Sequence, residues 1–136
     1  MKTFCAKTLI AFCAAFVFVS VASAKDARGR VLDAKATKSL VSNHMWQTPI
    51  IGGPGHYFWF WKSDGTVCLR QNEKAGKCLD TGTWKLKGNR LCYELTWYGS
   101  GLGLKSRCLR VVDKGKGHYE EMEESGLSTL KFSVVK

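Results

Sequence analysis

The sequence predicts a mainly β protein: a short N-terminal helix followed by a curled antiparallel meander or small barrel of about seven to eight strands, braced by disulfides. Three observations predict this class. Short apolar segments alternate with polar positions and are separated by glycine-containing turns. Residues 81–97 have the pattern of a complete β-hairpin. Four cysteines follow a leader that is typical of exported chains.

Residues 1–24 are predicted to be a secretion signal peptide. Lys2 and Lys7 precede an apolar run that starts at Thr8. The run ends in Ala22-Ser23-Ala24, small residues suited to a cleavage site. The run is shorter than the roughly 20 apolar residues that a membrane-spanning helix needs. Cleavage would leave residues 25–136 as a single exported domain, in the periplasm or outside the cell.

The predicted exported domain is basic. The leader holds two of the 21 lysines and arginines and none of the 11 acidic residues, so residues 25–136 carry a formal charge of +8. A positive surface favours association with anionic surfaces. We therefore expect an anionic envelope component or a protein as partner, no nucleic acid, no further membrane span and no cofactor.

The N-terminal part of the domain predicts little regular structure besides one helix. Residues 25–37 are polar and are predicted to form a flexible lead segment at the start of the domain. Residues 34–46 place Ala36, Leu40 and Val41 on one helical stripe that would cap an end of the sheet. The glycines and prolines of residues 47–55 then predict a loop.

The first hairpins follow this loop. Residues 56–62 form the most apolar predicted strand, which turns at Ser63-Asp64-Gly65 and pairs with residues 66–70. In the hairpin of residues 81–97, Gly88-Asn89 is taken as a two-residue turn. Its apolar face would consist of Trp84, Leu86, Leu91, Tyr93, Leu95 and Trp97.

Three more strands complete the predicted meander. They cover residues 104–112, 118–123 and 127–135, and turns rich in glycine separate them. Glu120, Glu121, Glu123 and Glu124 crowd the second of these strands and its turn. We expect them to balance lysines such as Lys114 and Lys131 across the sheet and not to perform acid–base catalysis.

The four cysteines outside the leader predict two disulfides. Three pairings are possible, and the sequence alone does not choose among them. If residues 91–97 and 104–112 are partner strands, Cys92 and Cys108 come to lie nearly opposite each other. Cys68 and Cys78 would then close the loop of residues 71–77. Spacings of this length do not suit a zinc site.

The candidate ligand site is the aromatic strand. Tyr57, Trp59 and Trp61 share one face of it, whereas Phe58 and Phe60 share the other. The phenylalanines are expected to pack in the core, so the first three side chains would form a platform for a ligand, with Lys62 and Arg70 nearby to attract an anionic one. The alternative is that the helix or a neighbouring strand covers the platform.

No residue pattern predicts catalysis. His44, His56 and His118 lie in different predicted elements, and no serine has a neighbouring base or a nucleophile-elbow motif. We therefore expect a non-enzymatic binding or envelope-associated protein. The alternative is an inhibitor or immunity-type protein that blocks another exported protein, because small disulfide-braced β-domains are suitable scaffolds for that role.

Four motifs resemble a known family. They are Trp61-x-Ser63-Asp64-Gly65-Thr66, Gly82-Thr83-Trp84-x-x-x-Gly88-x-x-Leu91-Cys92-Tyr93, Cys108-x-x-Val111, and the segment from Gly126-Leu127 to Phe132-Ser133-Val134. In their order and spacing they are similar to the domain-of-unknown-function family numbered 995, small exported proteins of rhizobia and related alphaproteobacteria. The resemblance implies an exported β-domain and supplies no catalytic residue.

Overall fold

Nine strands and two helices occur in the part of the chain that the computed structural model describes, residues 29–101 and 103–136. The predicted signal peptide lies outside the described residues. The elements in chain order are β1 (Arg30–Val31), α1 (Ala34–Val41), β2 (His44–Pro49), β3 (His56–Trp61), β4 (Thr66–Gln71), β5 (Asp80–Lys87), β6 (Arg90–Leu95), α2 (Tyr98–Gly101), β7 (Ser106–Gly115), β8 (His118–Met122) and β9 (Ser128–Val134).

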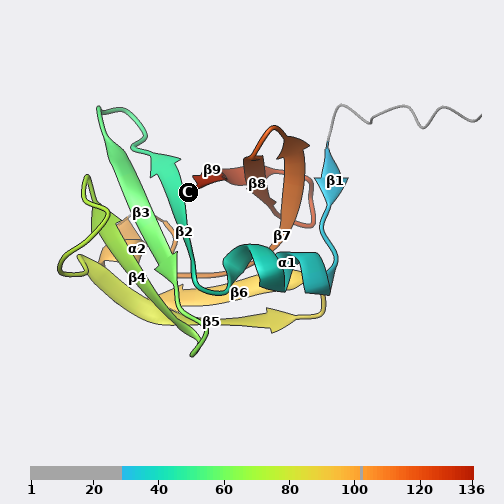
Figure 1. Ribbon diagram of the computed structural model, residues 1–136, viewed down its shortest axis with the longest axis horizontal. Coiled ribbons are helices and arrows are strands. Elements are labelled where there is room, and N and C mark those ends of the chain that lie inside the picture. Colours follow the sequence, from blue (N-terminus) through green and yellow to red (C-terminus); the bar gives the residue numbers. More distant parts are fainter. Residues whose placement is uncertain (1–28, 102) are drawn as a thin grey trace, which may run out of the picture.

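Strands β2 to β9 form a closed antiparallel barrel. Each strand from β2 to β8 pairs with the next strand in sequence, and β9 pairs with β2 to close the ring. The closing contact is short, because β2 and β9 are in register only at Trp46–Val134 and Gln47–Ser133. Strand β1 adds to the edge of β7. Figure 1 shows the strands around a common centre, as the predicted small barrel requires.

The N-terminal helix is shorter than predicted. Asp33 caps α1 by accepting a hydrogen bond from the Ala36 N–H at 2.7 Å. The helix ends at Val41, and Asn43 adopts a left-handed φ of 60° that turns the chain into β2. The expected helix to residue 46 is therefore wrong, and the expected loop over residues 47–55 begins only after Pro49, since β2 occupies His44–Pro49. Strand pairing with β3 overrides the helical spacing there.

The predicted flexible lead segment is also wrong in its second half. Arg30 and Val31 pair with Asp113 and Val112 of β7, and Leu32 is buried in the core. This pairing covers the part of β7 beyond the end of β6. A two-residue strand carries no alternation, so its sequence contains no recognisable signal.

The central hairpin is confirmed. Leu86 lies opposite Leu91 and Trp84 opposite Tyr93 in the β5–β6 pair. Gly88 has a φ of 60° at the first turn position, where a type II′ turn needs glycine. Trp97 departs from the prediction, because the strand ends at Leu95 and the Trp97 side chain is exposed.

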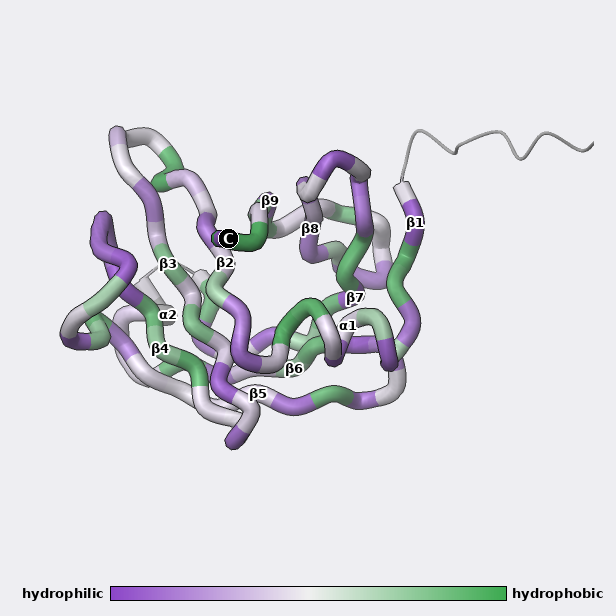
Figure 2. Tube along the Cα trace, in the orientation of Figure 1, coloured by the Kyte–Doolittle hydropathy of each residue, from purple (hydrophilic) through white to green (hydrophobic). Residues whose placement is uncertain are grey.

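The two ends of the barrel differ. At one end, α1 leads into β2 and places Val41 in the core, so this end is closed. The other end carries the β2–β3, β4–β5, β6–β7 and β8–β9 connections and is called the open end below. Figure 2 shows apolar segments in the strands and α1 and hydrophilic residues at most turns, but the β2–β3 connection at the open end is partly apolar.

Both predicted disulfides are present. Cys92 and Cys108 face each other in the β6–β7 register, and Cys68 and Cys78 close the loop between β4 and β5. Both bridges lie on the outer wall, because the neighbouring side chains Leu69, Leu91 and Leu109 point into the core. The bridges therefore brace the barrel without occupying its interior.

Removing either disulfide should destabilise the protein by about 2 to 3 kcal/mol, because a cross-link restricts the unfolded chain. The two loops span 16 and 10 residues, so the Cys92→Ala/Cys108→Ala variant should lose slightly more than Cys68→Ala/Cys78→Ala. Urea denaturation of the two double variants and the wild type measures both losses. Unchanged unfolding midpoints would contradict the prediction.

Candidate functional site

The predicted aromatic platform is buried. Trp59 and Trp61 are 0% exposed, and their rings stack with centroids 5.8 Å apart inside the barrel. The Trp59 indole N–H donates to the Thr48 hydroxyl at 3.1 Å. The expectation that Phe58 and Phe60 pack inside the barrel is wrong, since β3 turns its Tyr/Trp face inward; Phe58 is only 6% exposed but lies on the outer wall. In a closed barrel the larger indoles fill the centre, and the outer wall receives the phenylalanines.

The remaining predicted ligand residues do not meet. Lys62 follows β3 at the closed end, whereas Tyr57 lies near the open end. Arg70 is on the outer wall, where it donates to the carbonyls of Lys74 and Gly76 and braces the β4–β5 loop. Of this set, Tyr57 and Trp59 border a cavity at the open end. The structure therefore offers no exposed Tyr/Trp platform beside Lys62 and Arg70.

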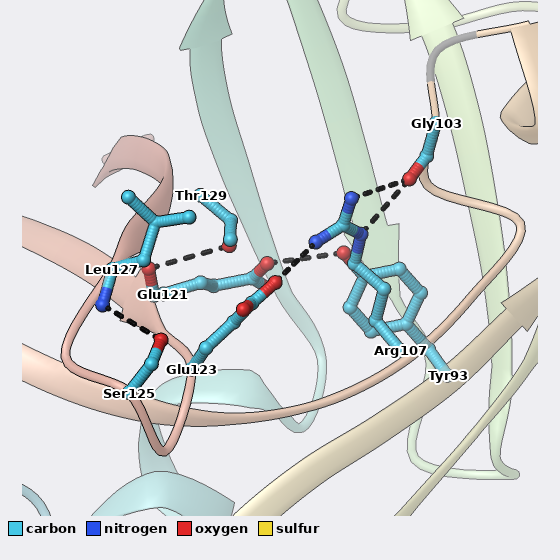
Figure 3. A network of polar contacts seen from close by, with 8 residues as sticks. All are labelled: Tyr93, Gly103, Arg107, Glu121, Glu123, Ser125, Leu127 and Thr129. Carbon is cyan, nitrogen blue, oxygen red and sulfur yellow. Dashed lines mark hydrogen bonds and ion pairs between the residues drawn. The ribbon is translucent and has the colours of Figure 1, made fainter.

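A polar network crosses the barrel interior near the open end (Figure 3). The Tyr93 hydroxyl of β6 donates to Glu121 Oε2 of β8 at 3.0 Å. Arg107 of β7 donates through Nη1 to Glu123 Oε1 at 3.2 Å, and its Nε and Nη2 donate to the Gly103 carbonyl. In Figure 3 the two carboxylates and the guanidinium point toward one another. Three consecutive strands, β6, β7 and β8, together with the turn after β8, thus place opposite charges together.

Glu121 is the unusual member of this network. Its side chain is 0% exposed, and its Oε1 has no hydrogen-bond partner among the described residues. Burial raises the pKa of Glu121 to about 7, although the Tyr93 hydrogen bond and the Arg107 charge lower it. Burial also raises the pKa of Tyr93 well above its usual value. The Tyr93 hydroxyl therefore keeps its proton, and Glu121 changes charge near neutral pH.

The open end contains a cavity of about 150 Å³ beside this network. Its walls are mostly apolar and include Arg107. Tyr57 borders it with a hydroxyl that lies 3.4 Å from the Tyr98 hydroxyl, and this hydrogen bond raises the pKa of Tyr57 to about 12. The lining residues are Thr48, Pro49, Ile50, Ile51, Tyr57, Trp59, Leu104, Arg107, Thr129 and Leu130.

A second hollow, of about 400 Å³, lies along the β2–β9 closure on the barrel wall. Lys114 and Lys131 border it, and their ammonium groups lie 3.7 and 3.9 Å from the Glu120 carboxylate between them. This confirms the predicted balance of Glu120 against lysines. Because that carboxylate already partners both lysines, we take the cavity at the open end as the candidate binding site.

The sequence reasoning missed Arg107 and Glu121. Strand alternation contained a signal for the second residue, because Tyr119 and Glu121 share a face of β8 and Tyr119 packs on the core. The cluster of four glutamates concealed this signal by suggesting a uniformly solvated segment. Alternation also placed Arg107 on the face of β7 that carries the buried Leu109 and Val111. The pairing of β7 with β8 brings Arg107 near Glu121 and Glu123.

No family model, curated protein or solved structure matches the chain. The resemblance to the domain-of-unknown-function family numbered 995 stays a prediction. Among the described residues, neither helix has the length and apolar character needed to cross a membrane.

Proposed function

We propose that this chain is an exported, non-enzymatic binding protein that holds one small, mostly apolar ligand in the open end of its barrel. The observation that carries the proposal is the cavity of about 150 Å³, with Trp59 and Leu130 in its wall. An eight-stranded barrel is wide enough to be filled by side chains or to hold one small ligand. Here the indoles fill the centre and leave space only near the open end.

The cavity volume limits the size of the ligand. An apolar protein cavity of about 150 Å³ is large enough to bind benzene. A single six-membered ring, or an aliphatic group of similar volume, therefore fits this site. A lipid with long acyl chains would not enter it completely. Export agrees with the two disulfides, which persist in oxidising compartments.

Binding of benzamide, a neutral one-ring probe, tests this proposal. We expect benzamide to shift the amide resonances of cavity residues in two-dimensional NMR spectra of the wild type. Leu130→Trp should abolish these shifts because the larger side chain fills the cavity. Leu127→Trp is the matched control, since Leu127 is 62% exposed outside the cavity. Saturable shifts that persist in Leu130→Trp would contradict the proposed site.

A second candidate function is inhibition of another exported protein. Three connections at the open end expose large apolar side chains: Ile51, Trp97 and Leu127 are 91%, 70% and 62% exposed. Exposed aromatic and aliphatic side chains on loops are typical of protein contacts. This function requires one stoichiometric partner whose activity falls on binding. The double variant Trp97→Ser/Leu127→Ser should then lose inhibition while still binding benzamide, since neither residue lines the cavity.

A further inference from the structure

We infer that the ligand of the open-end cavity is a small carboxylic acid whose carboxylate binds Arg107 while its apolar ring or chain fills the space beside Trp59 and Leu130. This inference rests on the proposed function and adds the chemical class of the ligand. It concerns Arg107 in the cavity wall, a charged residue that the apolar lining by itself does not require.

The structure holds the Arg107 guanidinium in place and leaves part of it open. Its Nε and Nη2 donate to the Gly103 carbonyl at 3.0 and 2.5 Å, and Nη1 donates to Glu123 at 3.2 Å. A guanidinium has five N–H groups, so each terminal nitrogen keeps one N–H without a partner among the described residues. A carboxylate is the group that accepts two such N–H bonds together.

The charges around Arg107 also favour an added carboxylate. Among the described residues, Glu123 is the one carboxylate that forms an ion pair with Arg107, and 41% of the Glu123 side chain is exposed. Glu123 can therefore move into water when a ligand carboxylate arrives. Glu121 is buried nearby, and burial favours its neutral form below about pH 7. The positive charge of Arg107 is then balanced by the exposed Glu123 carboxylate, which a ligand carboxylate can replace.

The comparison of benzoate with benzamide tests the inference, because the two probes share a ring and differ in charge. We expect wild-type protein to bind benzoate at least tenfold more tightly than benzamide at pH 6. Arg107→Gln should remove this preference, because it should weaken benzoate binding at least tenfold more than benzamide binding. Glu123→Gln should strengthen benzoate binding several-fold, because a competing carboxylate is lost. Glu124→Gln is the matched control, since Glu124 pairs with Arg90 and not with Arg107.

The pH dependence gives a readout that does not depend on a variant. The polar groups near the Glu121 carboxyl are Tyr93 from β6 and Arg107 from β7, with Glu123 two residues further along the chain; Thr129 from β9 donates to the Glu121 backbone carbonyl. As pH rises from 6 to 8, Glu121 becomes charged and should repel a ligand carboxylate. Benzoate affinity should fall several-fold over this range, whereas benzamide affinity should stay constant.

The outcomes separate the two proposals. Equal affinity for benzoate and benzamide, with both lost in Leu130→Trp, would overturn the carboxylate inference and leave the binding site intact. Absence of saturable binding by either probe would overturn both. A benzoate preference that survives in Arg107→Gln and does not change in Glu123→Gln would place the carboxylate elsewhere and overturn the inference. Near-native NMR spectra of each variant show that its fold is retained.

Discussion

Trp61→Ala should lower the free energy of unfolding by about 3 to 5 kcal/mol, the largest loss that we expect from a single core substitution. Trp61 is 0% exposed, and its ring centroid lies 4.7 Å from that of Trp46 and 5.4 Å from that of Tyr93. Removing the indole leaves a void among large rigid rings, which cannot collapse to fill it. Urea denaturation followed by far-UV circular dichroism measures the loss.

Two further variants sharpen this prediction. Trp61→Phe should cost clearly less, because it keeps one ring and removes a buried indole N–H that has no hydrogen-bond partner among the described residues. Trp97→Ala is the control and should change stability by no more than about 0.5 kcal/mol, since Trp97 is exposed. Equal losses in Trp61→Ala and Trp97→Ala would show that Trp61 does not belong to the core.

Glu121→Gln should make the protein more stable than the wild type at pH 8. The pKa of Glu121 is about 7 in the folded state and 4.5 when unperturbed, so the folded state binds an extra proton between these values. The stability that protonated Glu121 contributes is complete below pH 4.5 and is lost as pH rises to about 7. The loss amounts to roughly 3 kcal/mol.

Glutamine has no charge to bury and can still accept the hydrogen bond from the Tyr93 hydroxyl. The difference in unfolding free energy between Glu121→Gln and wild type should therefore be small at pH 4, grow through pH 6 and level off above pH 7. Glu124→Gln provides the control, because that side chain is largely exposed and should show little pH-dependent difference. A flat difference for Glu121→Gln would mean that Glu121 titrates normally.

The local parts of the fold could be predicted from the sequence. The β5–β6 hairpin follows from a turn at Gly88 and alternating apolar residues close in sequence. The disulfide pairing followed from the same reasoning, because a short connection makes β6 and β7 hairpin partners and sets Cys92 opposite Cys108. The strand count and the barrel-like class followed from regular turn spacing. Each of these depends on neighbouring segments alone.

Strand β2 could not be predicted in the same way. Its inward residues, Trp46 and Thr48, make too short an alternation to compete with the helical stripe that precedes them. Its strand conformation depends on pairing with β3 on one side and β9 on the other. The contact with β9 joins segments almost ninety residues apart. The residues around β2 therefore do not indicate that β9 is its partner.

The sequence by itself determined the alternation of each strand, the turns and the oxidised cysteine pairs, because those properties depend on local backbone geometry and composition. Closure of the barrel decided which face of β3 is inside. The indoles of Trp59 and Trp61 lie inside because a closed ring of strands has a single centre to fill. Pairing of β7 with β6 on one side and with β8 on the other placed Tyr93, Arg107 and Glu121 together. A buried carboxylate acquires its raised pKa from that environment, which no single strand contains.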